Sequence, residues 1–343
     1  MASPTVLTHL ASGAVSGVLS RCLTAPISTA KTNVQTLTAC TRTASGGMTR
    51  NEARALRSSF SAILAAESWP GLWKGNSIAV ARIIPYMAVR FAVYEELKLA
   101  AIAYSSQSLP PGGPGVDDPE GGGDGAGFGP GAKFAAGSLA GLSAVLVTYP
   151  LDLLKTSRTV TPLGHPSAKS VASAVRMHVK AGKGWSGLFR GFTPTLLGIV
   201  LHDGTAFLVF ETAKQMMVDS DLSDPESESE IKFAHNFVFG ALAGMAARTV
   251  SLPFDVVRKR LMVQPLLDSL GKHNLGSQAR AFRFDSMLST FADTIRHEGW
   301  RALWRGRLSN RISMILSAAV SFSLYEQCKR VMEKLVYIDD DHP

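Results

Sequence analysis

The sequence predicts an all-α membrane protein in which six transmembrane helices form three tandem repeats around a pseudo-threefold axis. Two observations predict this fold: a set of short motifs recurs three times at fixed spacing, and each copy contains two long apolar segments. The composition agrees with it, because only 18% of the 343 residues are charged and 46% are hydrophobic, whereas about a quarter of the residues are charged in soluble domains.

The repeat is defined by spacings that hold in all three copies. A proline follows nine residues after the second glycine of a glycine-bounded segment of small residues, which suits close helix packing in lipid. An aromatic-basic-glycine triplet comes later, and a second aromatic residue follows the first after 21 residues. The prolines are Pro26, Pro150 and Pro253, and the triplets are Trp73-Lys74-Gly75, Phe189-Arg190-Gly191 and Trp304-Arg305-Gly306. The repeats cover residues 5–98, 133–217 and 233–333, joined by linkers 99–132 and 218–232.

Each repeat supplies two spanning helices. Residues 134–151 and 312–325 contain no Asp, Glu, Lys or Arg, and residues 191–210 contain only Asp203, so these stretches approach the roughly 20 residues that cross a bilayer. The alternative is a soluble solenoid of three helical hairpins, which needs polar faces at helical period that are sparse in 134–151. The expected spans are 5–36, 76–98, 133–160, 192–217, 233–264 and 307–333.

Loop charge predicts the orientation. The three loops within repeats (37–72, 160–189 and 265–303) carry thirteen Lys/Arg and six Asp/Glu, whereas the two loops between repeats (99–132 and 218–230) carry ten Asp/Glu and no Lys/Arg. Positively charged loops stay on the side of insertion, so the loops within repeats face the inner compartment and both termini face the opposite side. Residues 105–132 are rich in Gly, Pro and Ser, and we expect them to be disordered.

Charged residues near the helix ends predict two gates. Ionisable groups at membrane depth are costly unless they face a cavity and find partners, and carboxylate and cation three residues apart share one helix face. Rings of such pairs at opposite ends of a central cavity predict an alternating-access carrier. The inner gate comprises Ser28, Lys31, Asp152, Lys155, Asp255 and Arg258, and the outer gate comprises Glu95, Lys98, Glu211, Lys214, Glu326 and Lys329.

Arginines within the spans predict an anionic solute, because the planar guanidinium binds carboxylate or phosphate in a two-pronged fashion. The alternative for each is a side chain that extends to a nearby interface, which fits Arg311 best and Arg82 and Arg90 least. The candidates are Arg21, Arg82, Arg90, Arg248 and Arg311.

These motifs resemble the signature of the mitochondrial carrier family: Pro-x-Asp/Glu-x-x-Lys/Arg on odd helices, the aromatic-basic-glycine triplet, and aromatic-Asp/Glu-x-x-Lys/Arg on even helices. The resemblance covers nearly the whole chain outside the linkers and tails. It implies a monomeric carrier of the mitochondrial inner membrane with both termini in the intermembrane space, an inner gate on the matrix side, and cardiolipin at the triplets. The triplets are also explained as helix starts with interfacial aromatic anchors.

The resemblance also places three solute contacts, near Arg82 and Arg90, at Gly198-Ile199 and near Met314. A glycine followed by an aliphatic residue is similar to the carriers of adenine nucleotides, coenzyme A and thiamine pyrophosphate, in which a flat base needs an apolar slot. His202 and Asp203 beside this slot depart from that pattern. A carrier of an organic or amino acid remains the alternative.

The first repeat departs from the family pattern at Ser28, where a carboxylate is usual. By the family's pairing, Asp152 meets Arg258 and Asp255 meets Lys31, while Lys155 faces Ser28 and forms no ion pair. We therefore expect an inner gate that opens more easily than the outer one. Neutral drift at Ser28, or a degenerate carrier that serves as a scaffold or receptor, are the alternatives.

Other function classes fit the sequence poorly. The eight histidines are scattered and the three cysteines are widely spaced, which predicts no metal site, no bound cofactor and no catalytic cluster. The glycine-rich stretch 121–129 lacks the Gly-Lys-Ser/Thr of a phosphate loop. The net charge of +8 suits nucleic acid in principle, but the basic residues lie in loops and spans, so we expect no nucleic-acid partner.

Overall fold

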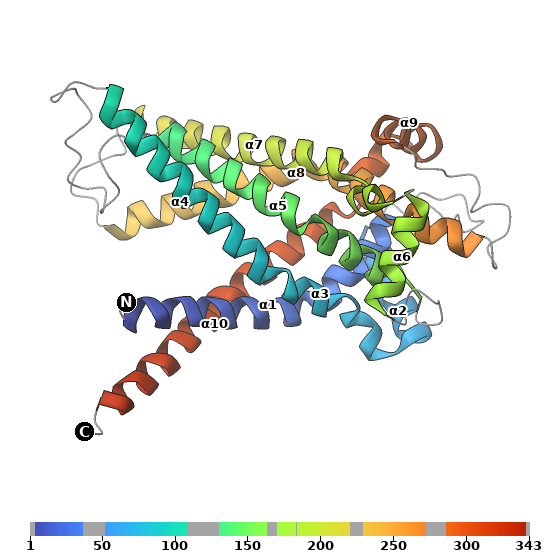
Figure 1. Ribbon diagram of the computed structural model, residues 1–343, viewed down its shortest axis with the longest axis horizontal. Helices are drawn as coiled ribbons and strands as arrows, with labels where there is room; N and C mark the ends of the chain where they lie inside the picture. Colours follow the sequence, from blue (N-terminus) through green and yellow to red (C-terminus); the bar gives the residue numbers. More distant parts are fainter. Residues whose placement is uncertain are drawn as a thin grey trace.

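The computed structural model describes residues 4–36, 52–108, 130–162, 170–182, 184–219, 229–271 and 286–340, and every regular element in these ranges is a helix. The predicted all-α class is therefore confirmed. Six long helices form the body of the molecule (Figure 1): α1 (Pro4–Thr36), α4 (Ile83–Ser108), α5 (Pro130–Val160), α7 (Phe192–Asp219), α8 (Ser229–Gly271) and α10 (Arg307–Asp340).

Short helices occupy the segments that the sequence analysis describes as loops within the repeats. They are α2 (Glu52–Glu67), α6 (Val171–Ala181) and α9 (Met287–Glu298), each followed by a 3₁₀ turn: η2 (Trp69–Trp73), η4 (Trp185–Phe189) and η6 (Trp300–Trp304). Reciprocal serine caps start two of them, Ser170 with Ser173 and Ser286 with Ser289, which satisfies amide groups that the helix leaves open. All three helices lie at one end of the molecule, here called the loop end (Figure 1).

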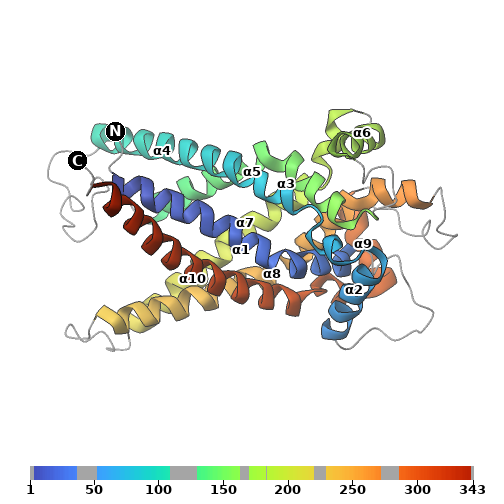
Figure 2. The same ribbon diagram turned by 90° about the horizontal axis from the view of Figure 1, so that it is seen from below.

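The long helices diverge away from the loop end, towards the end that carries both chain termini (Figures 1 and 2). The most extensive contacts join neighbouring repeats, with α4 against α5, α7 against α8 and α10 against α1. At the loop end α1, α5 and α8 also contact one another. This arrangement closes the bundle at the loop end.

The glycines of the three triplets show how the repeats close into a ring. Each has a positive φ, +73° at Gly75, +84° at Gly191 and +87° at Gly306, a backbone conformation that residues with a side chain rarely adopt. A Cβ atom added at Gly75 would lie 2.9 Å from the Lys155 carbonyl oxygen, and one at Gly191 would lie 3.0 Å from that of Arg258. At Gly306 it would meet Gln35 at 3.0 Å. Each triplet therefore contacts the odd-numbered span of the next repeat, as a pseudo-threefold axis requires.

Tryptophans of the triplets satisfy carbonyl groups that the prolines leave without a helical donor. Pro253 has no N–H to give to the Thr249 carbonyl, and the Trp304 indole N–H donates to that oxygen at 3.0 Å. In the first repeat Trp73 donates to the Cys22 carbonyl at 2.9 Å, four residues before Pro26. These bonds join the start of an even span to the proline of its own repeat.

The element boundaries differ from the prediction in several places, and α8 runs beyond both ends of the expected span 233–264. The second span is interrupted at Arg82, between α3 (Asn76–Ala81) and α4, because Pro85 cannot donate to the Ala81 carbonyl. Helix α4 extends to Ser108 and α5 begins at Pro130, so helix replaces both ends of the expected 99–132 linker. The α10 helix likewise continues to Asp340, beyond the expected end at 333. Residues 109–129, and with them most of the expected disordered segment, lie outside the described residues.

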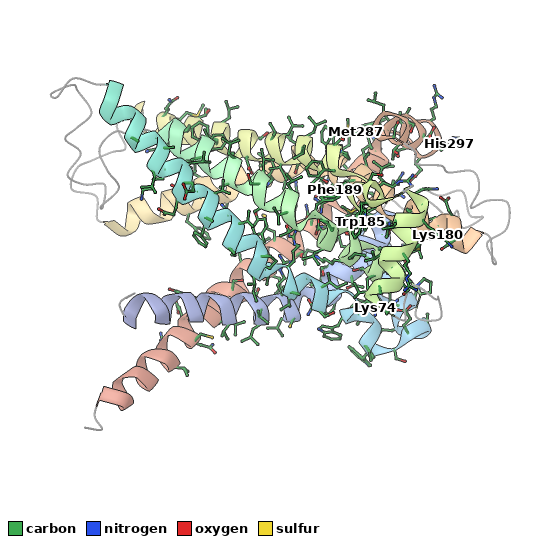
Figure 3. The ribbon with its side chains drawn as sticks, viewed as in Figure 1. Lys74, Lys180, Trp185, Phe189, Met287 and His297 are labelled. Carbon is green, nitrogen blue, oxygen red and sulfur yellow. The ribbon has the colours of Figure 1, made fainter. Side chains whose placement is uncertain are left out.

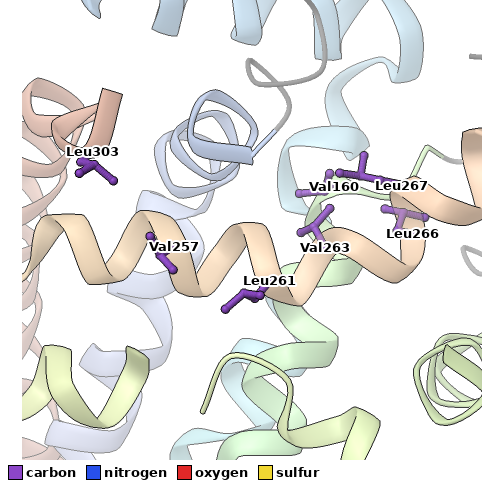
Figure 4. Packing of buried hydrophobic residues seen from close by; sticks show 7 residues of the cluster. All are labelled: Val160, Val257, Leu261, Val263, Leu266, Leu267 and Leu303. Carbon is purple, nitrogen blue, oxygen red and sulfur yellow. The ribbon is translucent and has the colours of Figure 1, made fainter. Parts of the chain in front are cut away.

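Among the described residues, the clusters of large buried apolar side chains lie at the loop end. A buried cluster joins α8, the end of α5 and η6 (Figure 4), and contains Val160, Val257, Leu261, Val263, Leu266, Leu267 and Leu303. Elsewhere many large hydrophobic side chains are exposed, including Leu23, Ile84, Phe91 and Leu208. In the described chain four segments are long and apolar enough to cross a bilayer, at 69–101, 134–160, 185–216 and 237–269. An apolar exterior of this kind suits a lipid surrounding.

Candidate functional site

A cavity of about 380 Å³ opens between α1, α3, α5, α8 and α10. The described residues that line it include five cations and eight hydroxyl side chains but no Asp or Glu. Fixed positive charge with many hydroxyl donors suits an anion that accepts several hydrogen bonds, such as a phosphate ester. The cations are Arg21, Lys31, Lys74, Lys155 and Arg248.

Helix α10 contributes a polar stripe that the sequence reasoning missed. Asn310, Ser313, Ser317 and Ser321 line the cavity at intervals of three and four residues, which places them on one helix face. Ser321 donates to the Ser20 hydroxyl of α1 at 2.8 Å. The helical period of these small polar residues in an otherwise apolar span was the signal that could have revealed them.

Asp152 lies at the centre of the strongest charge cluster at the closed end. Its side chain is only 10% exposed and forms an ion pair with Arg258 from α8, while Arg82 approaches at 3.4 Å. The pairing of Asp152 with Arg258 is the contact that the family resemblance implied. The second partner, Arg82, lies at the break between α3 and α4, and the sequence reasoning had placed it only at the solute.

Asp255 and Lys31 do not form the ion pair that the resemblance implied. Lys31 donates instead to the Asn310 side-chain oxygen of α10, and the nearest cation to Asp255 is Arg248 of the same helix at 3.8 Å. Asn310 supplies a neutral acceptor within reach of the lysine, which the spacing of charged residues could not reveal. The Gln35 side chain joins this region by accepting from Lys259 at 2.5 Å and donating to the Arg305 carbonyl at 3.2 Å.

The predicted outer-gate residues lie on the diverging halves of the even helices. Glu95 and Lys98 lie on α4, Glu211 and Lys214 on α7, and Glu326 and Lys329 on α10. Within the described residues Glu95, Glu211, Lys214 and Glu326 make no ion pair, and the Lys329 side chain lies outside them. In this structure the charge cluster at the loop end is assembled, while these four side chains at the other end are not paired.

Arg82 and Arg311 do not line the cavity as the described residues define it, and three more of the predicted solute residues lie away from it. Arg90 is exposed on α4, and neither it nor Gly198 or Ile199 lines the cavity. Gly198 instead lets α7 approach α8, because a Cβ atom added there would lie 3.2 Å from that of Phe254. Arg21 and Arg248, by contrast, line the cavity directly.

The basic residues of two triplets pair with acids of their own repeat. Lys74 forms an ion pair with Glu67 and donates to the Thr161 carbonyl at 2.6 Å. In the third repeat Arg305 meets Glu298 at 2.8 Å, and that carboxylate also holds the fully buried Arg260 at 2.6 Å. Figure 3 shows Lys74, Trp185 and Phe189 at the loop end.

The second repeat lacks this charged network. Ser157 takes the position of Arg260, and its buried hydroxyl has no partner among the described residues. The His178 side chain of helix α6 is completely buried, and neither ring nitrogen has a hydrogen-bond partner among the described residues. Burial, with a smaller contribution from the charge on Arg190, lowers the pKa of His178 from its usual 6.5 to about 4. The histidine is therefore neutral at physiological pH and serves as packing.

Comparisons with known proteins agree with the three-repeat architecture. A family model described as mitochondrial carrier protein matches residues 2–104, 127–221 and 229–335. A mitochondrial substrate carrier family protein of Dictyostelium discoideum is 30% identical over 94% of both chains. A mitochondrial adenine nucleotide transporter of Arabidopsis thaliana is 29% identical over 78% of this chain and 72% of its own length. A mitochondrial coenzyme A transporter of Xenopus tropicalis is 27% identical over 98% and 88%.

Proposed function

Because this chain belongs to the mitochondrial carrier family, as a multi-pass transporter and not an enzyme, we propose that it exchanges a phosphorylated anionic cofactor across the mitochondrial inner membrane. The observation that carries the proposal is the cavity, whose described lining holds five cations and no carboxylate. The relatives that transport adenine nucleotides and coenzyme A support an adenine nucleotide, coenzyme A or thiamine pyrophosphate as the solute.

The proposal includes two gates, one at each end of the cavity. The loop end faces the matrix and is closed by Asp152 with Arg258 and by the neighbouring contacts of Lys31 and Asp255. The other end, with both termini, faces the intermembrane space, and its predicted ring of charged pairs closes when the loop end opens. The structure would then represent the state that receives solute from the intermembrane space. Two gates that close alternately exchange solute without leakage.

In this proposal the aromatic-basic-glycine triplets bind lipid. Since the cations of Lys74 and Arg305 pair with Glu67 and Glu298, the backbone amides at the helix starts that follow these two triplets are left to bind the phosphates of cardiolipin. The protein works as a monomer, with the pathway inside a single chain.

Exchange by reconstituted protein tests the function, with Arg21→Gln as the variant. Arg21 lines the cavity and forms no ion pair within the described residues, so its loss leaves the gate intact. We expect the apparent affinity for ADP or coenzyme A to fall by about tenfold to a hundredfold, the value of a lost charge-assisted hydrogen bond. Arg176→Gln is the matched control, because Arg176 is exposed on α6. Equal exchange by both variants, or exchange only of neutral amino acids, would contradict the proposal.

A further inference from the structure

The first repeat lacks a negative charge where the other two carry one. Ser28 stands two residues after Pro26, in the position that Asp152 and Asp255 hold after their prolines. Its hydroxyl donates to the Ala25 carbonyl of its own helix at 2.9 Å. Helix α1 therefore offers no counter-charge to α5 at the closed end of the cavity.

Lys155 is the cation that this substitution leaves without a partner. In the described part of the chain it makes no ion pair or side-chain hydrogen bond, and the carboxylate one turn before it, Asp152, is already held by Arg258 and Arg82. An ammonium group away from bulk water is costly without a counter-ion. The cavity reaches this group, since Ser28 and Lys155 both line it.

Three of the other four cations of the cavity are less available. Lys74 is paired with Glu67, Lys31 donates to Asn310, and Arg248 lies 3.8 Å from Asp255. Arg21, about two turns before Ser28 on α1, resembles Lys155 in having no such partner within the described residues. Two available cations and a hydroxyl thus remain on the α1 and α5 sides of one cavity.

We propose that Ser28, Lys155 and Arg21 form a subsite for a second phosphate group of the solute. The anion takes the place of the carboxylate that α1 lacks, Lys155 and Arg21 supply the counter-charge, and the Ser28 hydroxyl turns from the Ala25 carbonyl to donate to a phosphate oxygen. The subsite therefore favours pyrophosphate-type groups over single phosphates. This inference deepens the proposed function, on which it rests for the identity of the solute.

Thermal unfolding of the full chain in detergent tests the subsite, with inorganic pyrophosphate and inorganic phosphate as probes. The variant Ser28→Asp restores the carboxylate, which pairs with Lys155 and repels the anion. We expect pyrophosphate affinity to fall about tenfold or more, while the unfolding temperature without ligand rises. Ser28→Asn has the shape of Ser28→Asp without its charge, and its amide N–H can donate to a phosphate oxygen. It is the matched control for the added charge, and we expect it to bind pyrophosphate more tightly than Ser28→Asp.

A second variant removes a cation that binds the anion, without adding a charge that repels it. Lys155→Gln introduces no negative charge, and we expect it to lose the preference for pyrophosphate over phosphate. The proposal is overturned if Ser28→Asp and Ser28→Asn bind pyrophosphate equally, if Lys155→Gln keeps the preference, or if pyrophosphate does not stabilise the unmodified protein. A different result bears on the proposed function: if pyrophosphate binds as expected but liposomes exchange neither ADP nor coenzyme A, the subsite stands and the assignment of the solute is wrong.

Discussion

The contact between Trp304 and the Thr249 carbonyl leads to a quantitative prediction. Pro253 removes the amide that would bond this carbonyl within α8, and the indole N–H replaces it at 3.0 Å. Trp304→Phe keeps an aromatic ring but removes the donor. A buried acceptor left without a partner costs about 1–3 kcal/mol, and water cannot replace the donor within a bilayer or detergent micelle. We therefore expect the free energy of unfolding to fall by about 2 kcal/mol.

Circular dichroism melting of the detergent-solubilised protein measures the effect, with Trp185→Phe as control. Trp185 is 76% exposed and its indole makes no hydrogen bond within the described residues, so its replacement should change the melting temperature little. Trp73→Phe should resemble Trp304→Phe, because Trp73 bonds the Cys22 carbonyl in the same way. If all three variants have the same melting temperature, the indole hydrogen bonds do not compensate for the amide groups that the prolines lack, and the reasoning fails.

Three further outcomes can be measured as free energies of unfolding in detergent. Asp152→Asn should cost about 3–5 kcal/mol, because it leaves the largely buried Arg258 without its counter-charge. Asp255→Asn should cost about 1 kcal/mol or less, since its partner Arg248 is 43% exposed and 3.8 Å away; equal costs would contradict this view of the gate. The unfolded chain protonates His178 below about pH 6.5 while the folded protein holds it neutral to about pH 4, so the unfolded state binds more protons in that window. Stability should therefore fall by about 3 kcal/mol as the pH falls from 6.5 to 4, and His178→Thr should lose that part of the dependence; an unchanged pH profile in the variant would exclude His178 as its source.

The repeats, the six long helices and the presence of cations within the spans could be predicted from the sequence. Motif spacing is a local property: nine residues from glycine to proline and 21 between aromatics hold whatever the chain packs against. Apolar length predicted the spans for the same reason. The charge on Arg21 and Arg248 indicated an anion before any neighbour was known, since a cation at membrane depth needs a counter-charge wherever it faces.

Which side chains contact one another was decided only by the packing of helices from different repeats. Lys31 reaches Asn310 across 279 positions of sequence, and no spacing rule distinguishes that neutral acceptor from the carboxylate of Asp255. Gly198 was expected at the solute, yet it lies against Phe254 because α7 and α8 approach closely there. The sequence gives the charge and polarity of each side chain directly. Which partner that side chain meets depends on how whole helices rotate and cross, and many contacts between residues distant in sequence determine that packing together.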